Sequence, residues 1–149
     1  MTIFHSMNNT ASALTAQRLR MDVISSNLAN ADSARSVNGD GPYRRKSVVL
    51  EPKESQFSSY LNKAMGKGSG SVGSGVKVSR IVEDKETPTK MVYDPAHADA
   101  DANGFVEMPN VDPLREMVDL ISATRSYEAN VTVFNATKGM MMKALEIGK

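Results

Sequence analysis

The residues best suited to chemistry lie in one acidic stretch that begins at Asp99. Asp99, Asp101 and Asn103 occupy the first, third and fifth positions of a calcium-binding loop. Gly104 supplies the turn glycine at the sixth position. The twelfth position holds Asn110 instead of the glutamate that closes such a loop, and no helix is expected before it. We therefore interpret the stretch as an acidic turn, with a calcium-binding interaction module as the alternative.

Other residue types that carry chemistry are sparse. The chain has no cysteine, which excludes disulfides, thiolate metal sites and a cysteine nucleophile. The two histidines, His5 and His97, lie in different regions, and neither has a second histidine at metal-ligand spacing. Neither a phosphate-binding glycine loop nor a nucleophile elbow is present. The sequence therefore predicts no enzyme activity and no catalytic, cofactor-binding or metal site.

Length and charge bound the class of protein. A chain of 149 residues with 40% hydrophobic and 23% charged residues is long enough for one domain with a modest core. The net charge of +1 gives no support to a nucleic-acid partner, and the basic run Tyr43–Lys46 is too short for one. No apolar segment of 18 residues occurs, so we expect no membrane insertion. The first residues lack the features of a secretory signal, so any export is expected to proceed without Sec-type cleavage.

Residues 1–31 are predicted to form a long N-terminal helix. Residues 2–31 contain no Gly or Pro, and apolar residues recur there at seven-residue steps, the spacing of one helix face. These residues are Met7, Leu14, Met21 and Leu28. At about 1.5 Å per residue this helix would be about 45 Å long, which is long for a domain of this size.

Residues 113–149 are predicted to form a second long helix. Asp112 suits its N-cap, Pro113 suits its first turn, and Gly148 suits its C-cap. Steps of three and four residues alternate along one seam, as in a coiled coil. The predicted seam is Met117, Leu120, Thr124, Tyr127, Val131, Phe134, Lys138, Met141 and Leu145.

The middle of the chain, residues 32–112, has a different composition. It is rich in Pro and Gly, which is not helical composition. Residues 43–50 and 75–82 partly alternate apolar and polar side chains and are predicted to be strands. Residues 66–75 are predicted to be a Ser/Gly linker, and residues 55–65 are a candidate short helix.

The fold class predicted from these regions is mainly α. Two long terminal helices are expected to pair as a coiled-coil-like hairpin, with a small, loop-rich insert that contains β-strands. On the helix pattern alone, a self-contained monomer such as a soluble helical-hairpin adaptor stays open.

Both helices carry long stretches without charge, which favours a polymer over a monomer. No charged residue occurs from Ser6 to Gln17 or from Ala129 to Thr137. A solvated helix face normally carries Glu–Lys pairs, whereas small uncharged residues allow close approach of a neighbouring chain. We expect neighbouring chains to meet the hydrogen bonds of these polar residues.

Motifs at both ends of the chain resemble one family. The segment Ser12–Ser33, with its Asn27-Leu-Ala-Asn30 run, resembles the N-terminal signature of the flagellar rod and hook family. The segment Ala123–Lys138 resembles the C-terminal partner motif of that family. The length and the stretch from Val92 to Met117 are similar to the short proximal rod members, although Ala98 stands where a proline is common.

This resemblance implies a structural subunit of the bacterial flagellar basal-body rod. Such a subunit is exported unfolded by the flagellar type III export apparatus and works outside the cytoplasm, in a rod that spans the cell envelope. It assembles with other rod subunits and with copies of itself into the torque-transmitting shaft around the export channel. The expected assembly interface is Leu14, Met21, Asn27, Leu28, Asn30, Tyr127, Val131, Phe134 and Met141. Asn27 and Asn30 are expected to bond to backbone or to a neighbour.

Overall fold

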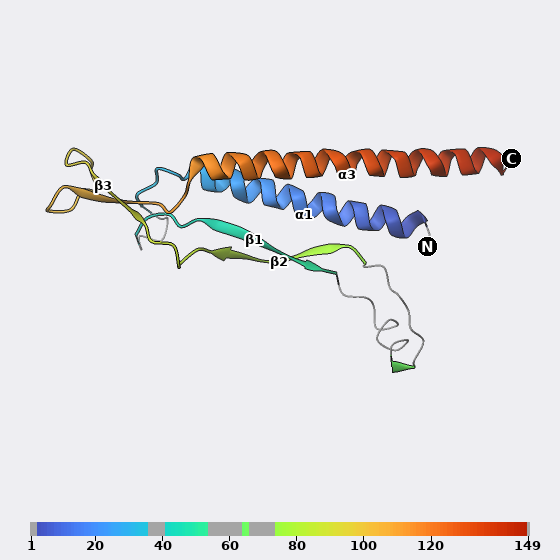
Figure 1. The fold of residues 1–149 in the computed structure, drawn as a ribbon, viewed down its shortest axis with the longest axis horizontal. Helices are drawn as coiled ribbons and strands as arrows, with labels where there is room; N and C mark the ends of the chain where they lie inside the picture. Colours follow the sequence, from blue (N-terminus) through green and yellow to red (C-terminus); the bar gives the residue numbers. More distant parts are fainter. Residues whose placement is uncertain (1–2, 36–40, 54–63, 66–73, 149) are drawn as a thin grey trace. The chain divides into compact units, whose positions relative to one another are not determined.

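Two long helices form most of the described part of the chain. The computed structural model describes residues 3–35, 41–53, 64–65 and 74–148 (Figure 1). Helix α1 covers Ile3–Ala29 and helix α3 covers Pro113–Ile147, which confirms both predicted terminal helices. Most of the candidate short helix at 55–65 and most of the linker at 66–75 lie outside the described residues.

The two ends of α3 are formed differently. The Asp112 carboxylate accepts a hydrogen bond from the Leu114 backbone N–H at 3.1 Å, which confirms the predicted N-cap beside Pro113. Gly148 follows the last helical residue, but its φ angle is not positive, so the predicted glycine C-cap is wrong in its geometry. The last turn is exposed, so water can satisfy its terminal carbonyl groups without a left-handed residue.

Strands β1, Lys46–Pro52, and β2, Val76–Glu83, form a two-stranded sheet. Backbone hydrogen bonds from Lys53 to Gly75 and from Asp84 to Arg45, both 2.8 Å, flank it in the order of an antiparallel pair. The predicted strand at 75–82 is shifted by one residue. The predicted strand at 43–50 begins three residues later, because residues 43–45 take part in a polar cluster described below.

Strands β3, Lys90–Tyr93, and β4, Phe105–Met108, form an antiparallel hairpin that the sequence did not predict. The first half of the calcium-loop pattern, Asp99–Gly104, lies in the connection between these strands, and its second half falls on β4 and the residues after it. Gly104 in this connection has φ +75°, and a Cβ there would lie 3.0 Å from the Tyr93 ring. Only glycine fits this turn without strain, so the glycine of the acidic stretch is explained by the hairpin.

The described residues belong to two compact units, and four elements contribute to both. The first unit takes in the described parts of Met1–Arg18, Val49–Arg80 and Thr124–Lys149. The second unit takes in the described parts of Leu19–Val48 and Ile81–Ala123.

In the first unit, the start of β2 approaches α1 closely. The Ser12 hydroxyl accepts a hydrogen bond from the Val76 backbone N–H at 3.1 Å and donates one to the Asn9 carbonyl at 2.7 Å. A Cβ at Gly75, whose φ is +101°, would collide with the Ser12 side chain. Glycine at this position therefore allows the strand to lie against the helix.

The core of the described residues is small and nearly as polar as it is apolar. Its buried apolar residues are Ala16, Val23, Ile24, Val106, Val111 and Ala123. Its buried polar residues are Thr10, Asn27, Asn110, Glu116 and Thr137. Because buried polar groups are costly unless hydrogen-bonded, this fold depends on polar pairing as much as on apolar burial.

The predicted seam of α3 is half right. One set of seam positions, seven residues apart, is half-buried as predicted: Leu120, Tyr127, Phe134 and Met141. The other set is displaced by one residue at three positions, because Glu116, Ala123 and Thr137 are buried while Met117, Thr124 and Lys138 are exposed. Val131, which also belongs to this set, is half-buried. A pattern search based on large apolar residues could not find these buried positions, because the residues there are small or polar. Leu145, the last predicted position, is 67% exposed.

Candidate assembly site

In the second unit, the end of α1, the start of β1 and the start of α3 meet in a cluster of polar side chains, which we call the polar junction. Its members are Asn27, Tyr43, Arg45, Lys46, Asn110, Glu116 and Asp119. Asn27 and Glu116 have no exposed surface at all. A buried carboxylate and a buried amide are stable only when their hydrogen bonds are met, and the junction meets them.

Asn27 uses its whole side-chain amide. Its Nδ2 donates to the Lys46 carbonyl at 2.8 Å and to Glu116 Oε2 at 3.0 Å. Its Oδ1 accepts from the Lys46 backbone N–H at 2.9 Å and from the Tyr43 hydroxyl at 3.0 Å. Two donors and two acceptors are the full capacity of an amide. Asn27 therefore fixes the end of α1 against the first residue of β1.

Glu116 is held by a charged partner as well. Its Oε1 accepts a hydrogen bond from Arg45 Nε at 2.6 Å. The guanidinium group of Arg45 also contacts Asp119 at 3.3 Å, and Asp119 lies 3.8 Å from Arg20 of α1. One arginine thus pairs with two carboxylates one turn apart on α3. Arg45, which belongs to the basic run Tyr43–Lys46, is therefore paired within its own chain.

Asn110 extends the junction to a loop before β3. Its Oδ1 accepts from the Arg45 backbone N–H at 2.8 Å, and its Nδ2 donates to the carbonyls of Asp84 and Thr87 at 3.0 and 3.2 Å. The Asp84 carboxylate organises that loop by accepting from the backbone N–H groups of Glu86 and Thr87 and from the Thr87 hydroxyl. Hydrogen bonds from the Thr87 backbone and then from its hydroxyl lower the pKa of Asp84.

Asn30 closes the end of α1. Its Nδ2 donates to the Ser26 carbonyl at 2.8 Å, and its Oδ1 accepts from the Ser33 hydroxyl at 3.2 Å. The expected bonds of Asn27 and Asn30 to backbone are therefore present. Met21 and Leu28 of α1 are half-buried in the same unit.

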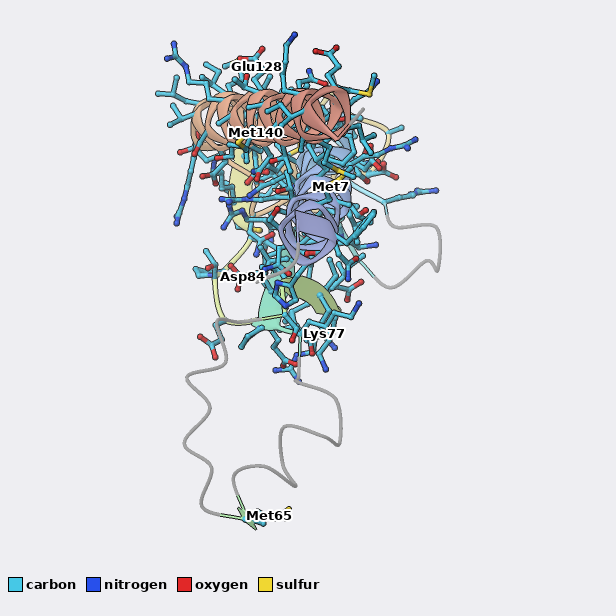
Figure 2. The ribbon with its side chains drawn as sticks, turned by 90° about the vertical axis from the view of Figure 1, so that its right-hand side faces the viewer. Met7, Met65, Lys77, Asp84, Glu128 and Met140 are labelled. Atoms are coloured by element: carbon cyan, nitrogen blue, oxygen red, sulfur yellow. The ribbon has the colours of Figure 1, made fainter. Side chains whose placement is uncertain are left out.

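In the first unit, the remaining residues of the predicted interface are half-buried. They are Leu14 of α1 and Tyr127, Val131, Phe134 and Met141 of α3. Figure 2 shows Glu128 on the side of α3 that faces away from Met7 of α1. The half-buried residues therefore have partial cover from their own chain, and the surface left on each can still meet a neighbour.

Four threonine hydroxyl groups on the two helices form hydrogen bonds within their own helix. Thr10 and Thr15 of α1 donate to carbonyls one turn earlier at 2.9 and 3.1 Å. Thr132 and Thr137 of α3 do the same at 3.0 and 2.9 Å. The expectation that neighbouring chains meet these bonds is wrong for these four residues, because a threonine side chain in a helix reaches the carbonyl four residues earlier. What such a face offers a neighbour is therefore largely methyl and Cβ surface.

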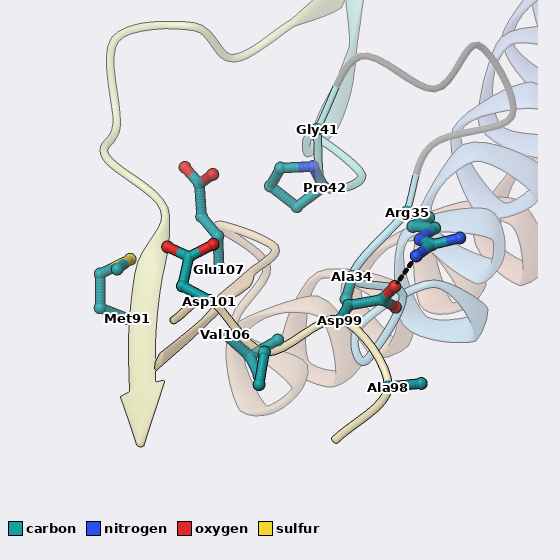
Figure 3. Close-up of a pocket in the computed structure, with 11 residues that line it drawn as sticks. Ala34, Arg35, Gly41, Pro42, Met91, Ala98, Asp99, Asp101, Val106 and Glu107 are labelled. Atoms are coloured by element: carbon teal, nitrogen blue, oxygen red, sulfur yellow. Dashed lines mark ion pairs between the residues drawn. The ribbon is translucent and has the colours of Figure 1, made fainter. Parts of the chain in front are cut away.

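The acidic stretch lines an open pocket beside β3 and β4 (Figure 3). Asp99 forms an ion pair with Arg35 there. Asp101 and Glu107, which also line this pocket, are exposed. Among the described residues, no group of three or more His, Cys, Asp or Glu side chains is arranged to hold a metal ion.

The sequence pointed to Asn27 but not to its partners. Asn27 lies in the motif that ends α1. Its partners are far apart along the chain, because Arg45 is separated from Asn110 by 65 residues and from Glu116 by 71 residues. No signal in the sequence indicated that Glu116 is buried, because the predicted seam placed Met117 on the inward side of α3 instead. A search over the described residues found no helix long and apolar enough to cross a membrane.

These features define a class of protein: a helical subunit whose two terminal helices are joined by a buried polar junction, with small β-elements between them. Two family models match the helical ends. The model described as "Flagella basal body rod protein" matches residues 7–35, and "Flagellar basal body rod FlgEFG protein C-terminal" matches residues 102–147.

Three relatives named flagellar basal-body rod protein FlgC match almost end to end. The protein of Bacillus subtilis is 65% identical, with all of both chains covered. That of Borreliella burgdorferi is 45% identical over 99% of this chain and 98% of its own, and that of Salmonella typhimurium is 44% identical with both chains covered completely. The chain belongs to the FlgC family of flagellar basal-body rod proteins.

Proposed function

We propose that the chain is a structural subunit of the flagellar basal-body rod that assembles through its two terminal helices. The observation that carries the proposal is that both family matches fall on the two long helices, α1 and α3. Those helices combine a saturated junction at one end with long uncharged faces elsewhere. A subunit of this kind works by packing, and its residues are contact residues that do not perform chemistry.

The export route, the location and the partners that we propose are those expected of a rod subunit. The subunit is exported by the flagellar type III apparatus and takes its place outside the cytoplasm, among other rod subunits and copies of itself. There the helices surround the export channel, and the shaft carries torque to the hook. Eight of the nine predicted interface residues keep exposed surface, and we assign these eight as contacts in the assembly. The ninth, Asn27, is fully buried and acts by holding the end of α1 in place.

The test compares two aspartate substitutions on neighbouring residues of α3. Phe134 is half-buried and belongs to the predicted interface, whereas Asn135 is exposed. Phe134→Asp places a charge in packed apolar surface, so we expect loss of swimming and loss of the chain from purified basal bodies. Export, measured as chain recovered outside the cytoplasm, is expected to continue. Asn135→Asp, which adds the same charge one residue away, should leave swimming nearly normal.

Two results would contradict the proposal. One is normal swimming of the Phe134→Asp strain. The other is absence of the unaltered chain from basal bodies of motile cells, which would remove the rod assignment as a whole.

A further inference from the structure

The connection between β3 and β4 carries an asparagine directly before a glycine, Asn103 before Gly104. An asparagine in this position can lose its side-chain amide without an enzyme, because glycine has no Cβ to keep its backbone nitrogen away from the side-chain carbonyl carbon. Asn103 is exposed, and its side chain forms no hydrogen bond with any described residue. Its amide group is therefore accessible to this reaction.

The other described asparagines lie in less reactive surroundings. Most of them belong to α1 or α3, where helical hydrogen bonds hold the backbone of the following residue: Asn8, Asn9, Asn27, Asn130 and Asn135. Asn30 and Asn110 are held by side-chain hydrogen bonds. None of these asparagines is followed by glycine, whereas a second Asn-Gly pair, at 38–39, lies outside the described residues. Within the described part of the chain, the structure therefore singles out Asn103.

A hydrogen-bonded turn around Asn103 controls access to the attacking nitrogen. The Gly104 backbone N–H donates to the Asp101 carbonyl at 2.8 Å, and the Asp101 N–H donates to the Phe105 carbonyl at 2.9 Å. Because no described residue other than glycine has a positive φ, the turn Asp101–Gly104 is of type I. While the turn is closed, the Gly104 N–H is engaged by Asp101. The reaction therefore requires the turn to open, which costs little free energy in an exposed loop.

We propose that Asn103 is a site of spontaneous deamidation and that opening of this turn sets its rate. The Gly104 nitrogen attacks the Asn103 Cγ, and the new C–N bond closes a succinimide ring. The side-chain amide group leaves as ammonia, with the proton that the Gly104 nitrogen gives up. Water then opens the ring at either of its carbonyl carbons and gives aspartate or isoaspartate. The net change is the gain of a water molecule and the loss of an ammonia molecule, so neither an oxidant nor a cofactor is needed.

Both products change the hairpin of β3 and β4. Aspartate adds a carboxylate close in sequence to Asp101, which is itself exposed. Isoaspartate also adds a methylene group to the main chain inside the turn, so the Gly104 N–H no longer matches the Asp101 carbonyl. The turn fixes the register in which Tyr93 pairs with Phe105. We expect this end of the hairpin to loosen as the modified fraction of the chain rises with time.

Peptide mapping by mass spectrometry of the purified, unaltered chain tests the site. The chain is incubated in mildly alkaline buffer, both folded and unfolded in urea, and the modified fraction of each asparagine is followed. In the folded chain, Asn103 should react roughly tenfold faster than Asn135, an exposed asparagine of α3 that is followed by alanine. In urea, where no turn restrains Gly104, Asn103 should react faster still. Asn103→Gln is the matched control for the effect on the hairpin, because glutamine keeps an amide but would have to form a larger ring. Hydrogen exchange of the backbone of β3 should rise with incubation in the unaltered chain and stay constant in Asn103→Gln.

Three results would overturn the inference. If Asn103 reacts no faster than Asn135 in the folded chain, it is not a preferred site. If Asn103 reacts equally fast folded and in urea, the turn does not set the rate. If hydrogen exchange of β3 rises equally in Asn103→Gln, the hairpin loosens for another reason. The reaction needs only the folded chain and water, so each of these results leaves the rod function proposed above standing.

Discussion

The helices of the two units are held in place by different kinds of contact. In the second unit, charged and amide groups are buried and matched atom for atom, as in the contacts of Asn27 and Glu116. In the first unit, both helices carry long stretches without charge, Ser6–Gln17 and Ala129–Thr137, and threonine hydroxyls there donate to their own backbone. A matched polar network specifies one partner, whereas small neutral surface accepts close packing from several. The second unit therefore depends on specific polar pairs, whereas the first depends more on close packing of small neutral side chains.

Removal of the buried carboxylate should give the largest effect on the second unit. Glu116→Ala leaves the Arg45 guanidinium without its 2.6 Å partner and removes an acceptor from Asn27. We expect a loss of roughly 3 kcal/mol in the free energy of unfolding, measured by urea titration of the purified chain. Glu128→Ala, an exposed glutamate on the same helix, should change it by less than about 0.5 kcal/mol. Equal losses in the two variants would show that the junction does not specify the fold.

Removal of the Asn27 amide should cause the second largest loss of stability. Asn27→Ala leaves the Tyr43 hydroxyl, the Lys46 backbone groups and Glu116 each short of one hydrogen bond. We expect the free energy of unfolding to fall by about 2 kcal/mol. Asn30→Ala is the matched control, because Asn30 is half-exposed at the helix end, and it should cost about 0.5–1 kcal/mol. A larger loss from Asn30 would mean that closure of α1 matters more than the junction.

Local features of this fold could be predicted from the sequence, whereas contacts between distant residues could not. Both helices were predictable because composition and capping are local, as the Asp112 cap illustrates. The junction was not, because Arg45 and Glu116 are 71 residues apart and each looks like an ordinary surface charge in sequence. The seam of α3 was displaced at Glu116, Ala123 and Thr137 for a related reason, since periodicity rules assign buried positions to large apolar residues. The hairpin of β3 and β4 was missed because four-residue strands are too short to show a period.

Substitutions at Gly139 and Gly104 should change stability in opposite directions, because only Gly139 has room for a Cβ. A Cβ at Gly139, in the first-unit part of α3, would meet nothing within 4 Å. Gly139→Ala should therefore raise the free energy of unfolding by about 0.5–1 kcal/mol, because alanine loses less entropy in a helix. Gly104→Ala in the second unit should lower it, since φ +75° and the Tyr93 ring leave no room for a side chain. Thermal unfolding of both variants followed by circular dichroism checks the contrast, and the same sign in both would break it.

The smallest effect is expected at Asp84, at the edge of the junction. Hydrogen bonds from Thr87 lower its pKa in the folded chain, so folding favours the ionised carboxylate. That contribution to stability is present above the ordinary carboxyl pKa of about 4 and is lost as the pH falls through the lower pKa of the folded state. Asp84→Asn should remove this part of the pH dependence, which urea titrations between pH 7 and pH 3 would measure. Thr87→Val keeps the backbone donor but not the hydroxyl, so it should fall between the two. A steeper acid loss in Asp84→Asn than in the unaltered chain would show that the carboxylate is not stabilised by this loop.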